Sequence, residues 1–424
     1  MRIAVIGAGA AGLAAIRRSC CSAEVVCYEK SDKVGGTWVY VPETGNDAYG
    51  LPIHSSMYES LRTNLPKEVM GYPDYLIPEN RKSYIHHDEI LAFLNDYCTH
   101  FQLRDKIKFL HNVELVEPIG AEEKGTGSNW KLRVRDLRKS TVTEEFFDAV
   151  MVCNGHYFKP SLPRLKGHET FKGQQMHSHD YRRPEPFADK RVVVIGAGPS
   201  GMDLALEISK KAKRVILSHH LKETILTKFP NNVVQKKDVV ELKDNSAVFQ
   251  DGTSEEADII FYCTGYEYSF PFLSESCEIK VNDNMITPLW KHVIAIENPT
   301  LVFIGIPFYV CAFSMFDLQV RFVLRYLNKE KELPTRDSML LDESQEKNSR
   351  FNIRGFTKRQ FHMMGPLQAE YYDDLADTAN IERLLPVLSK LHNESSDRFL
   401  DDLVHYRDDR YKIIDNENYQ QLND

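Results

Sequence analysis

A glycine-rich segment near the start of the chain has the spacing that binds the pyrophosphate of a dinucleotide. The segment, Gly7-Ala-Gly9-Ala10-Ala11-Gly12, directly follows the apolar run Arg2–Ile6. A short β-branched run indicates a parallel strand buried on both faces, and the glycines let the backbone approach a pyrophosphate at the N-terminus of the next helix. Roughly twenty residues after these glycines, the apolar residues 25–29 end in an acid. Glu29 is therefore predicted to bind a ribose hydroxyl.

A second segment repeats this signal in the middle of the chain. Gly196-Ala-Gly198-Pro199-Ser200-Gly201 follows the apolar run Arg191–Ile195, and Asp203 comes shortly after it. Two such segments in one chain are hard to obtain by chance. The chain is therefore predicted to bind two dinucleotides.

The residues that end the second strand of each motif predict which dinucleotide binds where. The first motif ends in Glu29, whereas the second ends in Ser218, His219 and His220. A carboxylate favours a free ribose 2′-hydroxyl and repels a 2′-phosphate, whereas neutral or cationic donors accept the phosphate. We therefore assign FAD to the first site and NADPH to the second. Neutral imidazoles are a weaker sign than an arginine, so NADH stays an alternative to NADPH.

Two further segments could contact a cofactor. Gly35-Gly36-Thr37-Trp38, which follows Glu29 and Lys30, has paired glycines that suit close packing against a second part of an extended cofactor, with a plain turn as the alternative. Residues 58–67, which include Thr63 and Asn64, are polar, contain a proline and show no helix or strand period. By themselves they predict only a loop.

The order of the remaining runs predicts a doubly wound α/β fold. Residues 149–155 and 258–266 are apolar until they reach a small-residue turn, as strands do where their carboxyl ends meet a ligand. Alternating runs within 106–152 predict a β-rich segment, while a strand at 301–305 and a helix at 316–328 indicate a return to the first sheet. We predict two Rossmann-like domains, the NADPH domain (161–280) being inserted into a discontinuous FAD domain (1–160 and 281–424).

Composition argues against several other classes. The formal charge of −8 has the wrong sign for binding nucleic acid or an anionic membrane. The longest apolar run, residues 301–313, is too short to span a bilayer, and the polar end of the chain predicts no membrane anchor. The eight cysteines include no C-x-x-C pair and the fifteen histidines no H-E-x-x-H spacing, so we predict neither a redox cysteine pair nor a metal site. We expect a soluble protein, cytoplasmic or, if a signal peptide has been removed, secreted; the sequence leaves a homo-oligomer open.

One pattern between the two glycine motifs is more specific. Phe171, Gly173, His177, Tyr181 and Arg182 have the spacing F-x-G-x-x-x-H-x-x-x-Y-R. On this pattern and the glycine motifs, the chain resembles the flavin-containing monooxygenases over nearly its whole length. It is most similar to the soluble insect members, which include pyrrolizidine alkaloid N-oxygenases.

The resemblance implies an enzyme that uses FAD, NADPH and O2 to form a C4a-hydroperoxyflavin, which oxygenates a soft nucleophile without a nucleophilic side chain. It suggests as substrate the tertiary amine of a pyrrolizidine-type alkaloid, which would become an N-oxide. Thioether S-oxygenation, Baeyer–Villiger oxidation and a non-catalytic redox sensor that binds FAD and NADP stay open as alternatives. By the same resemblance, Asn64 is the catalytic residue that hydrogen-bonds the flavin and its peroxide, Thr63 lies beside it, and Gln319 lies near the flavin.

The predicted contacts fall into two sets. Those to FAD are Gly7, Gly9, Ala10, Ala11, Gly12, Glu29, Lys30, Gly36, Thr37, Trp38, Thr63, Asn64 and Gln319. Those to NADPH are Gly196, Gly198, Pro199, Ser200, Gly201, Asp203, Ser218 and His219. A small nucleophilic substrate and O2 complete the expected partners.

Overall fold

Strand β1 (Arg2–Ile6) lies inside a seven-stranded sheet with the order β18-β19-β20-β7-β1-β2-β3. The computed structural model describes residues 1–79, 82–119, 128–221, 225 and 227–422. Strand β1 pairs in parallel with β2 and β7, and β7 pairs in parallel with β20, as the apolar runs predict. The other strands of this sheet are β2 (Glu24–Glu29), β3 (Ile107–Phe109), β7 (Ala149–Val152), β18 (Leu289–Trp290), β19 (Ile294–Ala295) and β20 (Leu301–Phe303).

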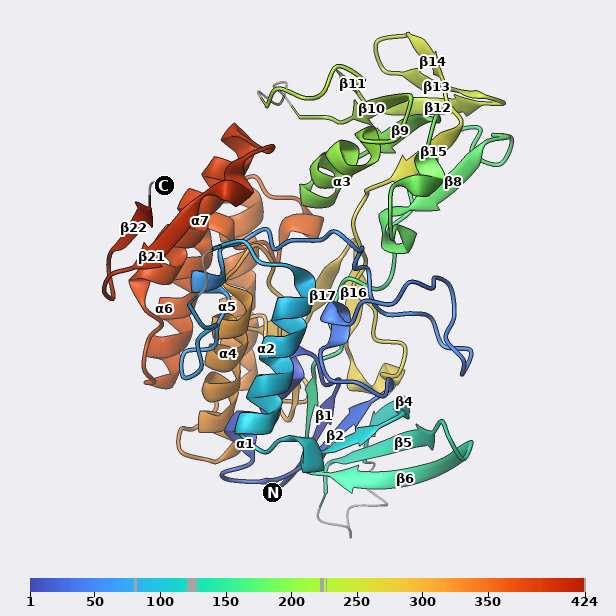
Figure 1. Ribbon diagram of the computed structural model, residues 1–424. Helices are drawn as coiled ribbons and strands as arrows, with labels where there is room; N and C mark the ends of the chain where they lie inside the picture. The colour runs from blue at the N-terminus through green and yellow to red at the C-terminus, as the bar shows by residue number, and fades with distance from the viewer. Residues whose placement is uncertain (80–81, 120–127, 222–224, 226, 423–424) are drawn as a thin grey trace.

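The alternating side chains of β1 enter two different hydrophobic clusters. Ile3 and Val5 pack with helices α1 (Ala10–Ser19) and α4 (Ala312–Leu327), whereas Ala4 and Ile6 pack with the sheet β4-β5-β6 on the opposite face. This three-stranded antiparallel sheet is formed by β4 (His111–Pro118), β5 (Trp130–Asp136) and β6 (Thr141–Phe147). Figure 1 shows it beneath the main sheet. The predicted β-rich segment is therefore the layer that covers one face of the first sheet.

A second parallel sheet carries the second glycine motif, in the order β11-β10-β9-β15-β8. Its central strand β9 presents Val192 and Val194 to helix α3 (Pro199–Ser209), and Val193 and Ile195 to the small sheet β12-β13-β14. This layering repeats that of the first domain. The strands are β8 (Gln174–His177), β9 (Arg191–Ile195), β10 (Arg214–Ser218), β11 (Val233–Lys236), β12 (Val239–Lys243), β13 (Ser246–Phe249), β14 (Ser254–Glu256) and β15 (Ile259–Tyr262).

The chain order confirms the predicted insertion of one Rossmann-like unit into another. All strands from β8 to β15 lie outside the first sheet, and β18, β19 and β20 rejoin it beside β7. In Figure 1 the inserted unit lies above the first one. The boundaries at residues 160 and 280 stay predictions.

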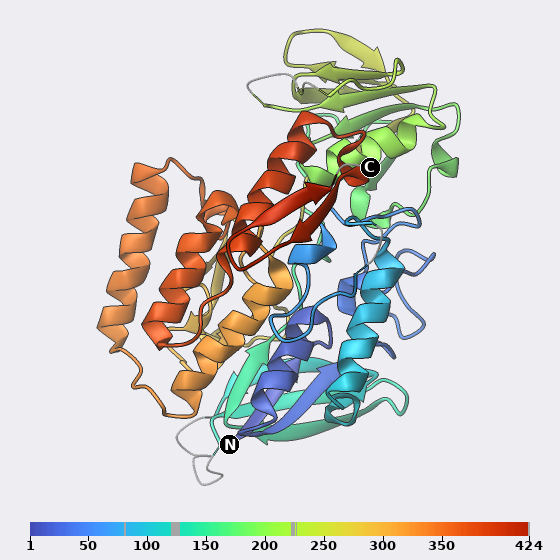
Figure 2. The same ribbon diagram turned by 60° about the vertical axis from the view of Figure 1, so that its left-hand side comes forward.

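C-terminal helices complete the first unit and reach the second. Helix α4 begins four residues before the predicted start at residue 316, because Phe313 is already buried there and stacks on Tyr72. Figure 2 shows helix α7 and the hairpin β21-β22 extending toward the inserted unit. The remaining elements are α2 (His87–His100), β16 (Lys280–Asn282), β17 (Met285–Thr287), α5 (Arg336–Asn348), α6 (Gln368–Ala379), α7 (Pro386–Asp401), β21 (Arg410–Ile413) and β22 (Tyr419–Leu422). Within the ranges given above, no helix is long and apolar enough to cross a membrane.

Charge-assisted hydrogen bonds between Arg191 and Asp258 join the starts of β9 and β15 in the second sheet. The Asp258 carboxylate, just before β15, accepts hydrogen bonds from the backbone N of Arg191 at 2.8 Å and from its Nε and Nη2 at 3.1 and 2.7 Å. These bonds from Arg191 lower the pKa of Asp258 to about 2, below its ordinary value of 3.8. The carboxylate therefore stabilises the junction of β9 and β15 in its ionised form.

We predict that Asp258→Asn destabilises the protein by about 1–2 kcal/mol at neutral pH, because hydrogen bonds to a charged group are lost from a partly exposed site. The pKa is depressed in the folded state, so this stabilisation is complete above the unfolded pKa and is lost as the pH falls from 3.8 toward about 2. Urea unfolding of both proteins should show a constant difference from pH 8 to about 5 that shrinks below about 4. Asp105→Asn, at an exposed position, is the control. A difference that grows at low pH would contradict the assignment.

Candidate functional site

The first glycine turn has no room for side chains where β1 passes into α1. Gly7 has φ +102°, and a Cβ there would lie 2.7 Å from the carbonyl oxygen of Cys153. A Cβ on Gly12 would lie 1.8 Å from the carbonyl oxygen of Gly7. Helix α1 begins after Gly9 with no side-chain cap, so its first N–H groups and the positive end of its dipole are available to an anion. This geometry fits a pyrophosphate held by Gly7 to Gly12, including the buried Ala10 and Ala11.

The paired glycines predicted to pack closely do so against the same turn. A Cβ on Gly36 would lie 3.0 Å from the Cα of Gly9, and the backbone N of Gly35 donates to the carbonyl of Ala8 at 3.1 Å. Next to them, the Thr37 hydroxyl is buried and has no protein partner among the described residues. Trp38 packs at the edge of the main hydrophobic cluster. A backbone cradle beside an unsatisfied hydroxyl fits one extended ligand running past both segments.

Glu29 lies at the carboxyl end of β2, close to the first turn. Its side chain is buried, and its two carboxylate oxygens each accept one backbone hydrogen bond at 2.8 Å, from the N of Ala8 and of Ser31. Each oxygen keeps acceptor capacity for a ribose hydroxyl. Lys30 donates to the carbonyl of Pro52 at 3.4 Å, and burial lowers its pKa.

The second glycine turn repeats the first in detail. Gly196 has φ +105°, and a Cβ on Gly201 would lie 1.9 Å from the carbonyl oxygen of Gly196. Helix α3 starts with Pro199, and the N-cap residue Gly198 supplies no side-chain cap. A Cβ added to Gly198 would have no neighbouring atom within 4 Å. Ser200, in the first turn of α3, is exposed. The open space at Gly198 and the free helix N-terminus fit a second pyrophosphate.

Ser218 and His219, at the end of β10, differ in whether their polar atoms already have protein partners. The Ser218 side chain is fully buried; its hydroxyl donates to the carbonyl of Lys237 at 3.0 Å and accepts from the N of Val239 at 3.1 Å. The hydroxyl is thus engaged inside the domain, and the contact of Ser218 with NADPH stays a prediction. His219 contacts the Gln235 Oε1 through Nε2 at 3.0 Å, and its buried Nδ1 has no protein partner within the described chain. The Nδ1 of His219 therefore has unused hydrogen-bonding capacity.

Asn64 is exposed and follows the buried Thr63. Thr63 is fixed by its backbone N, which donates to the carbonyl of Ile85 at 2.9 Å. The Asn64 Oδ1 accepts from the Arg407 Nη2 at 2.7 Å, while its Nδ2 meets no acceptor in the described residues. Asn64 thus presents a hydrogen-bond donor, which is what stabilisation of an oxygen-centred charge requires.

Asp203 and Gln319 make contacts that their predicted roles did not anticipate. Asp203 forms an ion pair with Arg407 and accepts a short hydrogen bond from Tyr58, so its carboxylate connects α3 with the first domain. Gln319 is fully buried; it accepts from the N of Gly305 at 2.9 Å and donates to the Tyr371 hydroxyl at 2.8 Å. No sequence motif pointed to Arg407 or Tyr58, since neither belongs to a periodic or spaced pattern.

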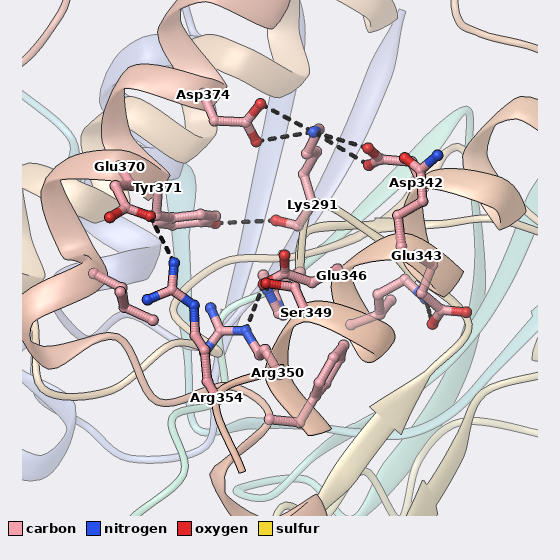
Figure 3. A pocket seen from close by; sticks show the side chains of 15 residues that line it. Lys291, Asp342, Glu343, Glu346, Ser349, Arg350, Arg354, Glu370, Tyr371 and Asp374 are labelled. Atoms are coloured by element: carbon pink, nitrogen blue, oxygen red, sulfur yellow. Dashed lines mark hydrogen bonds and ion pairs between the residues drawn. The ribbon is translucent and has the colours of Figure 1, made fainter. Parts of the chain in front are cut away.

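A separate cavity of about 350 Å³ lies between β18 and helices α5 and α6, and it contains none of the predicted cofactor contacts (Figure 3). Its charges are paired with one another. Lys291 lies between Asp342 and Asp374, and Arg354 contacts Glu370. Gln319 donates a hydrogen bond to the hydroxyl of Tyr371, which lines this cavity. Nowhere in the described chain are three or more His, Cys, Asp or Glu side chains grouped to hold a metal ion.

The second turn allows a test that separates protein sterics from ligand sterics. We predict that Gly198→Ala leaves FAD content and folding unchanged but raises the Kd for NADP+ at least about 10-fold, because its methyl group enters space that only the pyrophosphate would fill. Gly201→Ala, whose methyl would lie 1.9 Å from a carbonyl, should disturb the turn without ligand as well. Titration of the FAD-loaded protein with NADP+ by calorimetry measures the change. An unchanged Kd in Gly198→Ala would place the pyrophosphate elsewhere.

Comparison with known proteins agrees with this geometry. A family model described as flavin-binding monooxygenase-like matches residues 1–232 and 220–393. "Flavin-containing monooxygenase FMO GS-OX4" from Arabidopsis thaliana is 40% identical over 400 residues, which cover 88% of this chain and 84% of the relative. S-allyl-L-cysteine S-oxygenase from Allium sativum superposes with a TM-score of 0.88 at 34% identity, over 96% of this chain and 94% of the other. Tmm from Pelagibacter sp. strain HTCC7211 gives 0.85 at 28% identity, over 96% and 93%.

These matches confirm the resemblance to the flavin-containing monooxygenases drawn from the glycine motifs and the pattern at residues 171–182, while the closer similarity to insect members stays a prediction. They also confirm the assignment of FAD and NADPH as the cofactors. The chain belongs to the flavin-binding monooxygenase-like family, and it is a flavin-dependent monooxygenase.

Proposed function

We propose that this monooxygenase transfers one oxygen atom to the sulfur of a thioether. The observation that supports sulfur is the likeness over 96% of the chain to an enzyme named as an S-oxygenase. The tertiary amine predicted from the sequence is the second candidate, because an unprotonated amine nitrogen also carries a nucleophilic lone pair. The acceptor in either case is a lone pair on a soft heteroatom.

In the proposed reaction the protein positions and protects the cofactors. FAD reduced by NADPH supplies, with O2, the electrophilic oxygen. The residues Gly7 to Gly12, Glu29 and Thr37 would hold the first dinucleotide, and Gly196 to Gly201 with His219 would hold the second. Asn64 would offer its Nδ2 donor to the reacting oxygen, where a fixed dipole costs no reorganisation during the reaction.

The cysteines beside the two turns are unsuited to a competing thiol mechanism. Burial raises the pKa of the Cys153 and Cys263 thiols well above the ordinary value. They therefore stay protonated at neutral pH, and a thiol is a poor nucleophile. Their role is spatial, since each supplies the carbonyl against which Gly7 or Gly196 packs.

To identify the atom that accepts the oxygen, a thioether, a tertiary amine and a ketone are each supplied to the FAD-loaded enzyme with NADPH. We expect a sulfoxide as the main product, with one atom of ¹⁸O incorporated from ¹⁸O2, detected by mass spectrometry. An N-oxide formed with higher kcat/KM would select the second candidate. An ester from the ketone would indicate Baeyer–Villiger chemistry, and NADPH oxidation that no nucleophile couples to product would overturn oxygen transfer altogether.

We predict that Asn64→Ala retains FAD but yields at least about 10-fold less product per NADPH, with H2O2 taking its place, because a positioned donor to the oxygen is lost. Asn64→Asp, which has the same shape but lacks the donor, should behave alike. Asn352→Ala is the control, since that exposed amide donates to the side chain of Asn348. Coupled turnover in both Asn64 variants would remove Asn64 from the mechanism. Product, NADPH and H2O2 are quantified in the same reaction.

A further inference from the structure

The guanidinium of Arg407 joins three segments that are far apart in the sequence. It donates from Nε to the carbonyl of Thr63 at 3.1 Å and from Nη2 to the Asn64 Oδ1 at 2.7 Å. On its other side it forms a bidentate ion pair with Asp203, at 2.6 and 3.0 Å. Its side chain is only 15% exposed. All of these bonds use the planar fork of the guanidinium, which a lysine cannot reproduce.

This contact determines which end of the Asn64 amide is presented. A guanidinium has donors and no acceptor, so the amide must turn its oxygen toward Arg407. The Tyr406 hydroxyl lies 3.4 Å from the same oxygen and reinforces this orientation. The Nδ2 donor is then directed away from Arg407. Asn64 is exposed, whereas Arg407 is half-buried.

The same guanidinium connects Asn64 with the second nucleotide-binding domain. Asp203 belongs to α3, the helix that begins at the second glycine turn. The Asp203 carboxylate also accepts a hydrogen bond from Tyr58, which lies on the same polar segment as Asn64. Burial and the Asp203 charge raise the pKa of the Tyr58 phenol well above its ordinary value, so Tyr58 remains a donor. A movement of α3 relative to residues 58–64 would therefore disturb the group that orients Asn64.

We propose that Arg407 is a positioning residue, which holds the Asn64 amide with Nδ2 toward the reacting oxygen and makes this orientation depend on the docking of α3 through Asp203. The proposal rests on the function proposed above for Asn64. It assigns a role in oxygen transfer to the segment between α7 and β21.

A double-mutant cycle tests the orientation. In the FAD-loaded enzyme, Arg407→Met should lower product per NADPH about 10-fold when Asn64 is present, and less than about 2-fold when it is combined with Asn64→Ala, because coupled residues give non-additive effects. Arg407→Lys should recover only part of the loss. Arg398→Met is the matched control: it removes the ion pair with Asp409 at 2.7 Å from the same part of the chain without touching Asn64. Equal losses from Arg407→Met in both backgrounds, or no loss at all, would overturn the proposal.

Hydrogen–deuterium exchange tests the holding of the segment without turnover. Amides of residues 61–66 should exchange at least about 5-fold faster in Arg407→Met, whereas Arg398→Met leaves them unchanged. Asp203→Asn should give an intermediate increase, since it weakens the link to α3 but keeps Arg407. Unchanged exchange in Arg407→Met would overturn the proposal even if activity fell. Full coupling in Asn64→Ala would instead refute the proposed function of Asn64, and the exchange data would then show separately whether Arg407 holds this segment.

Discussion

Both nucleotide sites depend on one backbone contact, in which the third glycine of each turn packs against the carbonyl oxygen of the first. A Cβ on the third glycine would lie 1.8 Å from that carbonyl oxygen in the first turn and 1.9 Å from it in the second. Only glycine permits a helix to start this close to the strand that precedes it. This closeness leaves the N-terminus of the helix uncapped and directs its dipole at the ligand. The layers around each sheet, with helices on one face and a small antiparallel sheet on the other, keep this strand, turn and helix in place.

The two sites share this construction and differ in what surrounds the turn. At the first, a buried carboxylate and a second pair of glycines meet the turn, so an extended dinucleotide can pass along several segments. At the second, the space over Gly198 is open and the polar groups lie on β10. The first turn is therefore the more enclosed of the two, and the second is open over Gly198.

The charged contacts between the units have a separate role from the glycine turns. Arg407 and Asp203 are mostly buried, so their attraction is less screened by water and salt than that of a surface pair. Removing either partner would leave an uncompensated charge between the two domains. The pair therefore favours one arrangement of the domains, and Asn64 lies within that arrangement. By contrast, in the cavity of Figure 3 Lys291 pairs with Asp342 and Asp374, and Arg354 pairs with Glu370.

The sequence by itself determined the fold class, the insertion of one unit into the other, the two glycine turns, and FAD and NADPH as the cofactors. These features are encoded by local spacing: glycines follow an apolar strand at fixed positions, and their steric requirement acts over a few residues. Glu29 could be predicted for the same reason, since a parallel βαβ unit places the end of its second strand beside the turn. The helix at α4 was predicted too short, because the burial of Phe313 against Tyr72 is a contact between distant segments.

Only the tertiary structure decided how the side chains between these motifs are used. It showed the Ser218 hydroxyl engaged inside its domain, Asp203 in an ion pair and Gln319 in an internal hydrogen bond. It also identified Arg407, which lies 343 residues from Asn64 and 204 from Asp203 in the chain. Such contacts leave no periodicity or spacing in a single sequence, because they arise only after separate elements have packed together. The amide orientation of Asn64, unlike the glycine turns, is therefore a property of the folded molecule.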